Sequence, residues 1–222
     1  MDQESLKKQS AEAALSYVKD DAIIGVGTGS TVKYFIDALA SIKGRIAGTV
    51  ASSLATEKQL KALGIPVLDL NAAGQVALYV DGADEANQYG YLIKGRGGAL
   101  TREKIIASVS EKFICIVDQT KWVTILGHNS PVPIEVVPMA RSLVGRKIVG
   151  LNGNPVYRDN YLTDNGNIII DAYNLDISRP LELENALNCI PGVVENGLFA
   201  HRPADIIIKA TPQGIETIKP LR

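Results

Sequence analysis

The sequence contains few of the residues from which metal sites and disulfide frameworks are built. Its 222 residues include two cysteines and two histidines. With only His128 and His201 available, a histidine-rich metal site cannot form, and we expect no metal. Cys115 lies inside the apolar run 113–117, far along the chain from Cys189. This placement favours a buried thiol over a disulfide or a nucleophile.

A charge excess of one sign and a long apolar run are also missing. Lysine and arginine number 23 against 24 aspartates and glutamates, a net charge of −1. We therefore expect no nucleic-acid partner, because no broad basic face is available for a polyanion. No apolar run approaches the ~18 residues that a membrane span needs. The first residues are acidic and polar, unlike a targeting peptide, so we expect a cytoplasmic protein with no membrane partner.

Short apolar runs alternate with helical patterns through the first half of the chain. Hydrophobic residues make up 46% of the sequence and charged residues 21%, an ordinary globular composition for one large or two modest domains. The alternation is typical of a parallel sheet covered by helices. We predict strands at 22–26, 49–51, 65–70, 76–80 and 113–117, a hairpin-like stretch at 91–94, and helices at 6–18, around 32–39, at 55–63 and at 100–109.

The pattern changes after about residue 127. We predict a strand at 134–137, a helix at 139–149, strands at 155–158 and 167–173, a helix at 181–188 and a strand at 193–199. This βαββαβ order is that of a ferredoxin-like unit. Segments 205–208 and 214–218 resemble strands that rejoin the first sheet. The fold class we predict is α/β: a Rossmann-like open sheet with helices on both faces (1–127 and 201–222) and an inserted α+β domain (128–200), a candidate for oligomer contacts.

A glycine-rich turn, 25–31, lies between the first predicted strand and the helix after it. Backbone N–H groups and the helix dipole favour an anion at such a turn. A dinucleotide fingerprint is excluded because Ser30 stands where its last glycine is required, and the Gly-Lys-Ser/Thr of a P-loop is absent. Three hydroxyls, at 28, 30 and 31, suit a terminal phosphate or sugar oxygens. The alternative is a tight turn in which a hydroxyl caps the helix.

Acidic residues follow the predicted strand 76–80, at Asp81, Asp84 and Glu85. They emerge at the carboxyl end of the strand, the edge at which open α/β sheets bind ligands. Paired carboxylates also bind magnesium, and acids at a strand end serve as ordinary turn formers or helix caps. These three interpretations stay open on the residues alone.

A second glycine-rich loop, 94–99, precedes a predicted helix that carries Glu103. Its glycines let the main chain approach a small ligand, and Lys94 offers a cation to a developing oxyanion. The helix dipole also explains an acid in the first helical turn, and Lys121 is of a kind usually found solvated at a surface. Together, these residues place an anion-binding turn, several acids and a lysine at consecutive strand ends of one sheet.

At these segments the sequence resembles the ribose-5-phosphate isomerase family, type A. The resemblance is carried by GVGTGST at 25–31, YVDGADE at 79–85, KGRGGALTREKIIA at 94–107, FICIVD at 113–118 with Lys121, and TDNGN at 163–167. It runs over nearly the whole chain. It implies a Rossmann-like domain with a small α+β domain, a homodimer or homotetramer, and no cofactor. The implied reaction interconverts ribose 5-phosphate and ribulose 5-phosphate, a small-molecule sugar phosphate, through an enediolate.

Carried over by position, the resemblance implies roles for individual residues. Glu103 would be the general base between C2 and C1, Asp81 and Asp84 would assist ring opening and proton transfer, and Lys94 would stabilise the enediolate oxygen. A carboxyl group with an unperturbed pKa of ~4.3 is ionised at neutral pH, as a base must be, although clustered acids raise one another's pKa. The implied substrate contacts are Thr28, Gly29, Ser30, Thr31, Asp81, Gly82, Ala83, Asp84, Lys94, Gly95, Arg96, Gly97, Lys121 and Lys7.

Two positions depart from the family pattern. Arg96 stands where we expect glycine, and Thr120 where we expect Ser or Ala. Arg96 would strain the loop if the position requires a positive φ, or would point outward without effect. A non-catalytic sugar-phosphate sensor of related fold would be expected to lack the base, and Glu103 is present. A nucleotide-dependent oxidoreductase is disfavoured by Ser30.

Overall fold

The centre of the molecule is a six-stranded sheet. The structure is a computed structural model, and it describes residues 2–221. The sheet has the order β13-β12-β6-β3-β1-β2. All of its neighbouring pairs are parallel except β12 and the edge strand β13, which are antiparallel. Its strands are β1 (Ile23–Val26), β2 (Gly48–Ala51), β3 (Leu78–Asp81), β6 (Phe113–Asp118), β12 (Ile206–Thr211) and β13 (Gly214–Ile218).

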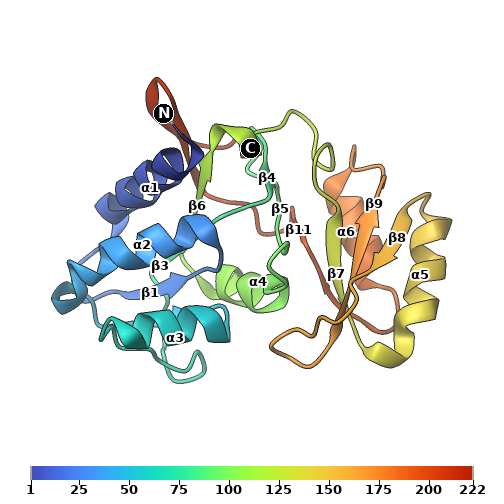
Figure 1. The fold of residues 1–222 in the computed structure, drawn as a ribbon, viewed down its shortest axis with the longest axis horizontal. Coiled ribbons are helices and arrows are strands. Elements are labelled where there is room, and N and C mark those ends of the chain that lie inside the picture. The colour runs from blue at the N-terminus through green and yellow to red at the C-terminus, as the bar shows by residue number, and fades with distance from the viewer. Residues whose placement is uncertain (1, 222) are drawn as a thin grey trace.

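Helices cover both faces of this sheet (Figure 1). Helices α1 (Gln3–Ala14) and α2 (Ser30–Ala40) pack on one face, and α4 (Leu100–Val109) packs on the other. Strand β6 is buried along its whole length because its side chains alternate between the two faces. Ile114 and Ile116 belong to the core under α1 and α2. Cys115 faces the core under α4 as a free, fully buried thiol, which confirms the predicted burial.

A smaller antiparallel sheet forms a second unit, at the right of Figure 1. Its order is β10-β7-β9-β8, which is the order of a ferredoxin-like βαββαβ unit. Helices α5 (Arg141–Gly150) and α6 (Pro180–Asn188) share one apolar core with its strands. The strands are β7 (Val132–Val136), β8 (Asn154–Tyr157), β9 (Ile168–Tyr173) and β10 (Val193–Asn196).

A three-stranded sheet joins the two units. It has the order β11-β5-β4 and consists of β4 (Glu85–Ala86), β5 (Leu92–Ile93) and β11 (Leu198–Phe199). The predicted strand 193–199 therefore contributes to two sheets. Its break is at Gly197, whose N–H donates to Pro133 and whose carbonyl accepts from Lys94. A Cβ at Gly197 would lie 2.2 Å from the Lys94 carbonyl oxygen, so glycine is required where the chain crosses.

The predicted α/β fold class is confirmed, and one predicted strand is wrong. Segment 65–70 is not a strand: Val67 makes a single parallel bridge to Thr49 beside β2. Pro66 has no N–H to continue a ladder, and the Asp69 side chain turns the chain by accepting from the amide of Asn71. Helix α3 (Leu54–Ala62) precedes this segment. The division at residues 127 and 200 remains a prediction. Within residues 2–221, every helix is too short or too polar to cross a bilayer.

Candidate active site

A cavity of about 490 Å³ lies where β1, β3 and β6 end, at the carboxyl edge of the main sheet. Every site residue that the sequence implies lines it, except Asp81, which is fully buried. Gln3 and Val32, which the sequence did not indicate, also line it. The full lining is Gln3, Lys7, Thr28, Gly29, Ser30, Thr31, Val32, Gly82, Ala83, Asp84, Lys94, Gly95, Arg96, Gly97, Glu103 and Lys121.

The turn between β1 and α2 forms one wall of the cavity. Gly29 has a φ of 130°, a conformation that glycine adopts without strain. A Cβ at Gly27 would lie 1.9 Å from Oδ1 of Asp81, so a side chain there would displace the carboxylate. The Thr28 hydroxyl lies 2.7 Å from the Ser52 hydroxyl and donates to Ser53 at 2.8 Å. The hydroxyl is therefore engaged by the protein.

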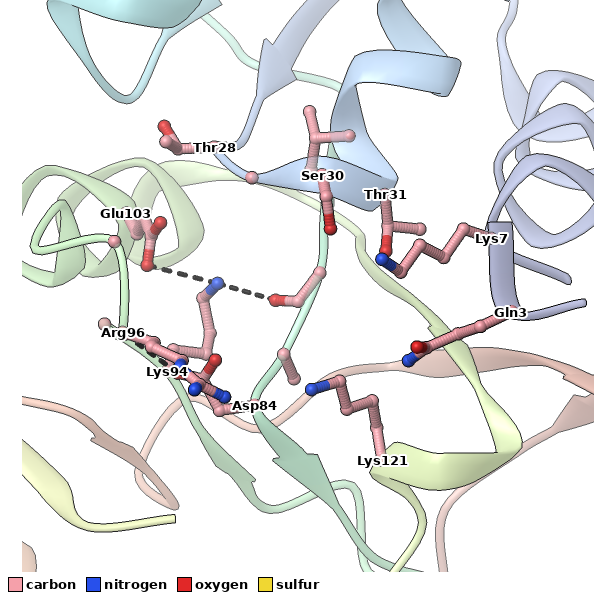
Figure 2. A pocket seen from close by; sticks show the side chains of 16 residues that line it. Gln3, Lys7, Thr28, Ser30, Thr31, Asp84, Lys94, Arg96, Glu103 and Lys121 are labelled. Atoms are coloured by element: carbon pink, nitrogen blue, oxygen red, sulfur yellow. Dashed lines mark hydrogen bonds and ion pairs between the residues drawn. The ribbon is translucent and has the colours of Figure 1, made fainter. Parts of the chain in front are cut away.

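One end of the cavity is suited to an anion. Figure 2 shows the amino groups of Lys7 and Lys121 and the hydroxyls of Ser30 and Thr31 directed to the same region, at the N-terminus of α2. Two cations, two hydroxyls and a helix N-terminus together favour a phosphate group. The amide of Gln3 also points to this region in Figure 2. Its nitrogen donates to Asp118 at 3.3 Å, which connects α1 to the end of β6.

The buried carboxylate of Asp81 lies beside this cavity with four hydrogen-bond or ion-pair partners. Its Oδ1 accepts from the amides of Thr28 (3.1 Å) and Gly82 (2.7 Å). Its Oδ2 accepts from the hydroxyl of Tyr79 and lies 2.7 Å from Nζ of Lys94. These four partners hold the carboxylate in one orientation. The side chain is fully buried and does not line the cavity, so the substrate contact implied for Asp81 stays a prediction.

Lys94 lies between the carboxylates of Asp81 and Glu103, and Figure 2 shows its contacts with Glu103 and with the Gly82 carbonyl. Its Nζ is 2.7 Å from Asp81 and 3.1 Å from Oε2 of Glu103, and it donates to the Gly82 carbonyl at 2.6 Å. Burial by itself would lower the pKa of Lys94, but Asp81 and Glu103 outweigh burial, so the pKa is raised. The lysine therefore stays a cation, and the three-residue cluster has one excess negative charge only when both Asp81 and Glu103 are ionised.

Glu103 occupies the first turn of α4 and is 4% exposed. Its Oε2 is buried and, among residues 2–221, has no aligned hydrogen-bond donor, although the Lys94 ammonium lies nearby. Burial, followed by the charge of Asp81, raises the pKa of Glu103 to about 8, against the opposing effect of Lys94. The contribution of Asp81 has the direction expected for clustered acids, and burial adds to it. A carboxylate with a pKa near neutrality can both take up and return a proton.

Asp84 holds the loop that carries Lys94. Its Oδ2 accepts from the backbone N–H of Arg96 at 2.9 Å. Gly95 (φ 104°) and Gly98 (φ 77°) take the positive φ angles of this loop, and Arg96 does not. Arginine is therefore tolerated without backbone strain, and the strained alternative is excluded. The Arg96 side chain is exposed at the rim between this cavity and a neighbouring one.

Tyr79 is a site residue that sequence reasoning missed. It is fully buried in β3, two positions before Asp81. Because side chains two residues apart in a strand point to the same face, alternation along 79–81 could have indicated the contact between its hydroxyl and Asp81. No comparable pattern indicates Gln3 or Val32, since their positions depend on how α1 and α2 meet the sheet.

The side chains that line the cavity determine which reactions it can catalyse. The Glu103 carboxyl group lies beside the Lys94 ammonium, and two lysines, two hydroxyls and the N-terminus of α2 lie at the other end. Within residues 2–221, His, Cys, Asp and Glu side chains form no group of three or more suited to a metal ion. The fold and the site define the class: an α/β enzyme that moves a proton on a small phosphorylated substrate, as aldose–ketose isomerases do.

Comparison with known proteins identifies the family within this class. The family model for ribose 5-phosphate isomerase A (phosphoriboisomerase A) matches residues 48–214. The chain is similar to the crystal structure of ribose 5-phosphate isomerase A from Neisseria gonorrhoeae, with a TM-score of 0.97 and 45% identity over 100% of this chain and 99% of the other.

Two further solved structures agree. A D-ribose-5-phosphate isomerase in complex with phospho-erythronic acid has a TM-score of 0.94 and 40% identity, over 99% of this chain and 100% of the other. The enzyme from Plasmodium falciparum has a TM-score of 0.92 and 30% identity, over 99% and 100%. The chain belongs to the ribose 5-phosphate isomerase A family, and its activity is that of a ribose-5-phosphate isomerase.

Proposed function

We propose that the chain interconverts D-ribose 5-phosphate and D-ribulose 5-phosphate through an enediolate, with Glu103 as the group that carries the proton between C2 and C1. The observation that carries this proposal is the buried Oε2 of Glu103. It has no aligned donor among residues 2–221 and lies 3.1 Å from the Lys94 ammonium. A proton next to a carbonyl is weakly acidic, so its removal needs both a positioned base and a cation near the developing charge.

The phosphate of the substrate is proposed to bind at the end of the cavity formed by Lys7, Ser30, Thr31 and Lys121. This end and the Lys94–Glu103 pair lie in one cavity of about 490 Å³, a size suited to a five-carbon sugar phosphate. Binding the phosphate at a fixed point would hold C1 and C2 near Glu103 in a reactive orientation.

The two aspartates are proposed to have different tasks. Asp81 has four partners and would act as the fixed counter-charge of Lys94. Asp84 lines the cavity and is bound at Oδ2 by the Arg96 amide. It would assist ring opening and exchange protons with the sugar oxygens, because it is the more accessible of the two carboxylates.

A homodimer or homotetramer and a cytoplasmic location are proposed as well. The small unit exposes large apolar side chains, Met139 (96% exposed) and Leu162 (65%), which a second copy of the chain could cover. A phosphorylated sugar does not cross a bilayer freely, which favours an enzyme located where the substrate is made. Light scattering of the purified chain would distinguish a monomer from the proposed oligomers.

A coupled assay for ketose formation tests the proposed function. The purified chain is given ribose 5-phosphate, and ribulose 5-phosphate is measured over time, while calorimetry measures binding of the same sugar. We expect turnover that saturates with ribose 5-phosphate and is absent with unphosphorylated ribose at the same concentration. Tight binding of ribose 5-phosphate without turnover would contradict the proposal and point to a sensor.

A further inference from the structure

We propose that Tyr79 is a positioning residue for the isomerase reaction: its buried hydroxyl fixes the Asp81 carboxylate as an oriented anion, and this fixes where Lys94 and Glu103 stand. The inference rests on the proposed role of Glu103. It concerns a residue that does not line the cavity and is not among the residues that the sequence implies.

The ring of Tyr79 is held so that its hydroxyl can point only towards the site. It packs against Phe113, with ring centroids 4.9 Å apart. On the other side, Gly25 of β1 leaves room for the ring, since a Cβ there would lie 2.9 Å from Cδ2 of Tyr79. The side chain is fully buried. Burying a hydroxyl costs free energy unless it is hydrogen-bonded. The Tyr79 hydroxyl has Asp81 as its acceptor.

The bond to Asp81 completes a set of donors in which each carboxylate oxygen has two. Oδ1 accepts from the backbone amides of Thr28 and Gly82, and Oδ2 has Tyr79 and Lys94. The two amides belong to the main chain and cannot be lost by substitution of a side chain. Tyr79 is therefore the neutral side-chain donor that shares Oδ2 with the ammonium, and its removal leaves Lys94 to satisfy that oxygen.

Loss of the Tyr79 hydroxyl affects Glu103 because Lys94 contacts both carboxylates. One ammonium lies between two carboxylates, 2.7 Å from Asp81 and 3.1 Å from Glu103. The positive end of the Tyr79 O–H dipole offsets part of the charge of Asp81. Without it, Lys94 is drawn towards Asp81 and Glu103 faces a stronger negative field. A carboxyl group in a stronger negative field holds its proton more tightly.

The other groups around Tyr79 do not oppose the expected rise in the proton affinity of Glu103. Burial, then Asp81 and Glu103, raise the pKa of Tyr79 well above its usual value, so the hydroxyl stays a donor at neutral pH. From β6, Cys115 faces the same side, and burial raises its pKa to about 12, so it stays a thiol. Strand β1 contributes no titratable residue. Lys94, Glu103 and, further out, Asp84 are the remaining charged groups.

Tyr79→Phe tests the proposal, because it removes one oxygen and keeps the ring. The ¹³C resonance of the Glu103 carboxyl group, assigned with Glu103→Gln, is titrated by NMR in the wild type and in the variant. We expect the Glu103 titration in Tyr79→Phe to move to higher pH by about half a unit or more. The acid limb of the kcat profile should move with it, with kcat at pH 7 lowered about threefold or more and KM changed less than about twofold.

Two further variants serve as a control and as a test of coupling between Tyr79 and Asp81. Tyr89→Phe removes a half-exposed hydroxyl elsewhere on the molecule and should leave both the titration and kcat unchanged. In an Asp81→Asn background, Tyr79→Phe should add less than about a twofold change, because the acceptor charge is already gone. An unshifted Glu103 titration in Tyr79→Phe, or an undiminished effect in the Asp81→Asn background, would overturn the proposal. The NMR titration needs no turnover, so it stands even if the proposed reaction fails.

Discussion

At the scale of single residues, the chemistry depends on carboxylates whose environments differ although their residue types do not. Asp81 is buried with four partners, and Glu103 is buried with an oxygen that has no aligned donor among residues 2–221. The sequence predicted that both belong to one cluster, because both follow elements that end at the same sheet edge. It could not predict which one would have a raised pKa, because burial and the position of Lys94 arise only on folding.

The raised pKa of Glu103 predicts a dependence of stability on pH. In the unfolded chain the carboxyl ionises near its ordinary value of 4.5, and in the folded chain only near pH about 8. Between these values the folded state binds the additional proton, so this group makes the protein less stable as pH rises. Glu103→Gln removes the titration. The variant should therefore gain melting temperature over the wild type at pH 8.5, and most of that gain should disappear at pH 5.

This dependence is measured by thermal unfolding of both proteins across that pH range. Lys61, an exposed lysine in α3, offers a control substitution, Lys61→Gln, whose effect should not vary with pH in this way. A melting-temperature difference between Glu103→Gln and the wild type that stays constant from pH 5 to 8.5 would contradict the raised pKa.

Arg96 is expected to be dispensable for the chemical step. Its side chain is exposed at the cavity rim, and the adjacent glycines carry the positive φ angles. The contact of this residue with Asp84 uses the backbone N–H, which any residue except proline provides. Arg96→Gly should therefore keep kcat within about tenfold of the wild type, or ~1.4 kcal/mol of barrier. Steady-state kinetics check this, and a larger loss of kcat would show that the guanidinium takes part.

At the scale of elements, the sequence predicted those helices and strands whose apolar pattern is complete. Strand β6 and helix α4 have the predicted limits to within about a residue. The sequence was less informative where pairing with neighbours decides the structure. Segment 65–70 has the composition of a strand but makes one bridge. Strands β5 and β11 lie within the predicted stretches 91–94 and 193–199, but their pairing with each other and with β4 was not predicted. These pairings orient Lys94, so the position of the site depends on contacts that periodicity does not describe.

Glu135 shows how an element outside the cavity supports it. It is fully buried in β7 and accepts from Thr163 at 2.8 Å, from the Asn167 side chain at 2.8 Å, and from Thr101 at the start of α4. Glu135→Ala would leave these donors without an acceptor. We expect it to lower the free energy of unfolding by about 2–4 kcal/mol, measured by urea denaturation.

A half-buried acid on the surface of α3 provides the comparison for Glu135. Glu57 pairs with Lys61 one helical turn away on α3, and surface pairs of this kind contribute little. Glu57→Ala should change the free energy of unfolding by less than about 1 kcal/mol. Equal effects of the two substitutions would refute the importance given to the Glu135 contacts.

At the scale of the whole molecule, the cavity exists because a parallel sheet brings the ends of β1, β3 and β6 to one edge. The sequence predicted this edge, since the residues that follow each strand carry the hydroxyls, acids and lysine of the site. Gln3 and Lys7 come from α1, and their approach depends on how that helix packs across the sheet. This part of the site was predicted only by resemblance to the family, for Lys7, or not at all, for Gln3.

Activity of the whole enzyme is expected to need no metal ion. The carboxylates of the site already have protein partners: Asp81 has four, Asp84 has the Arg96 amide, and Glu103 faces Lys94. A metal ion would have to displace a buried ammonium to reach two of them. Prolonged treatment with a strong chelator, followed by the coupled assay, should leave kcat unchanged. Complete loss that a divalent ion restores would disprove this.

The central claim is that Glu103 carries the proton and that this role is separate from binding. Glutamine is nearly isosteric with glutamate but cannot accept the C2 proton, while Lys94 and the Ser30–Thr31 end of the cavity remain to hold the sugar phosphate. The most direct measurement is kcat of Glu103→Gln together with its calorimetric affinity for ribose 5-phosphate. We expect kcat to fall at least ~10²-fold while the dissociation constant changes less than about threefold. Turnover of the variant at a near wild-type rate would contradict this claim, and the base would then have to be another group.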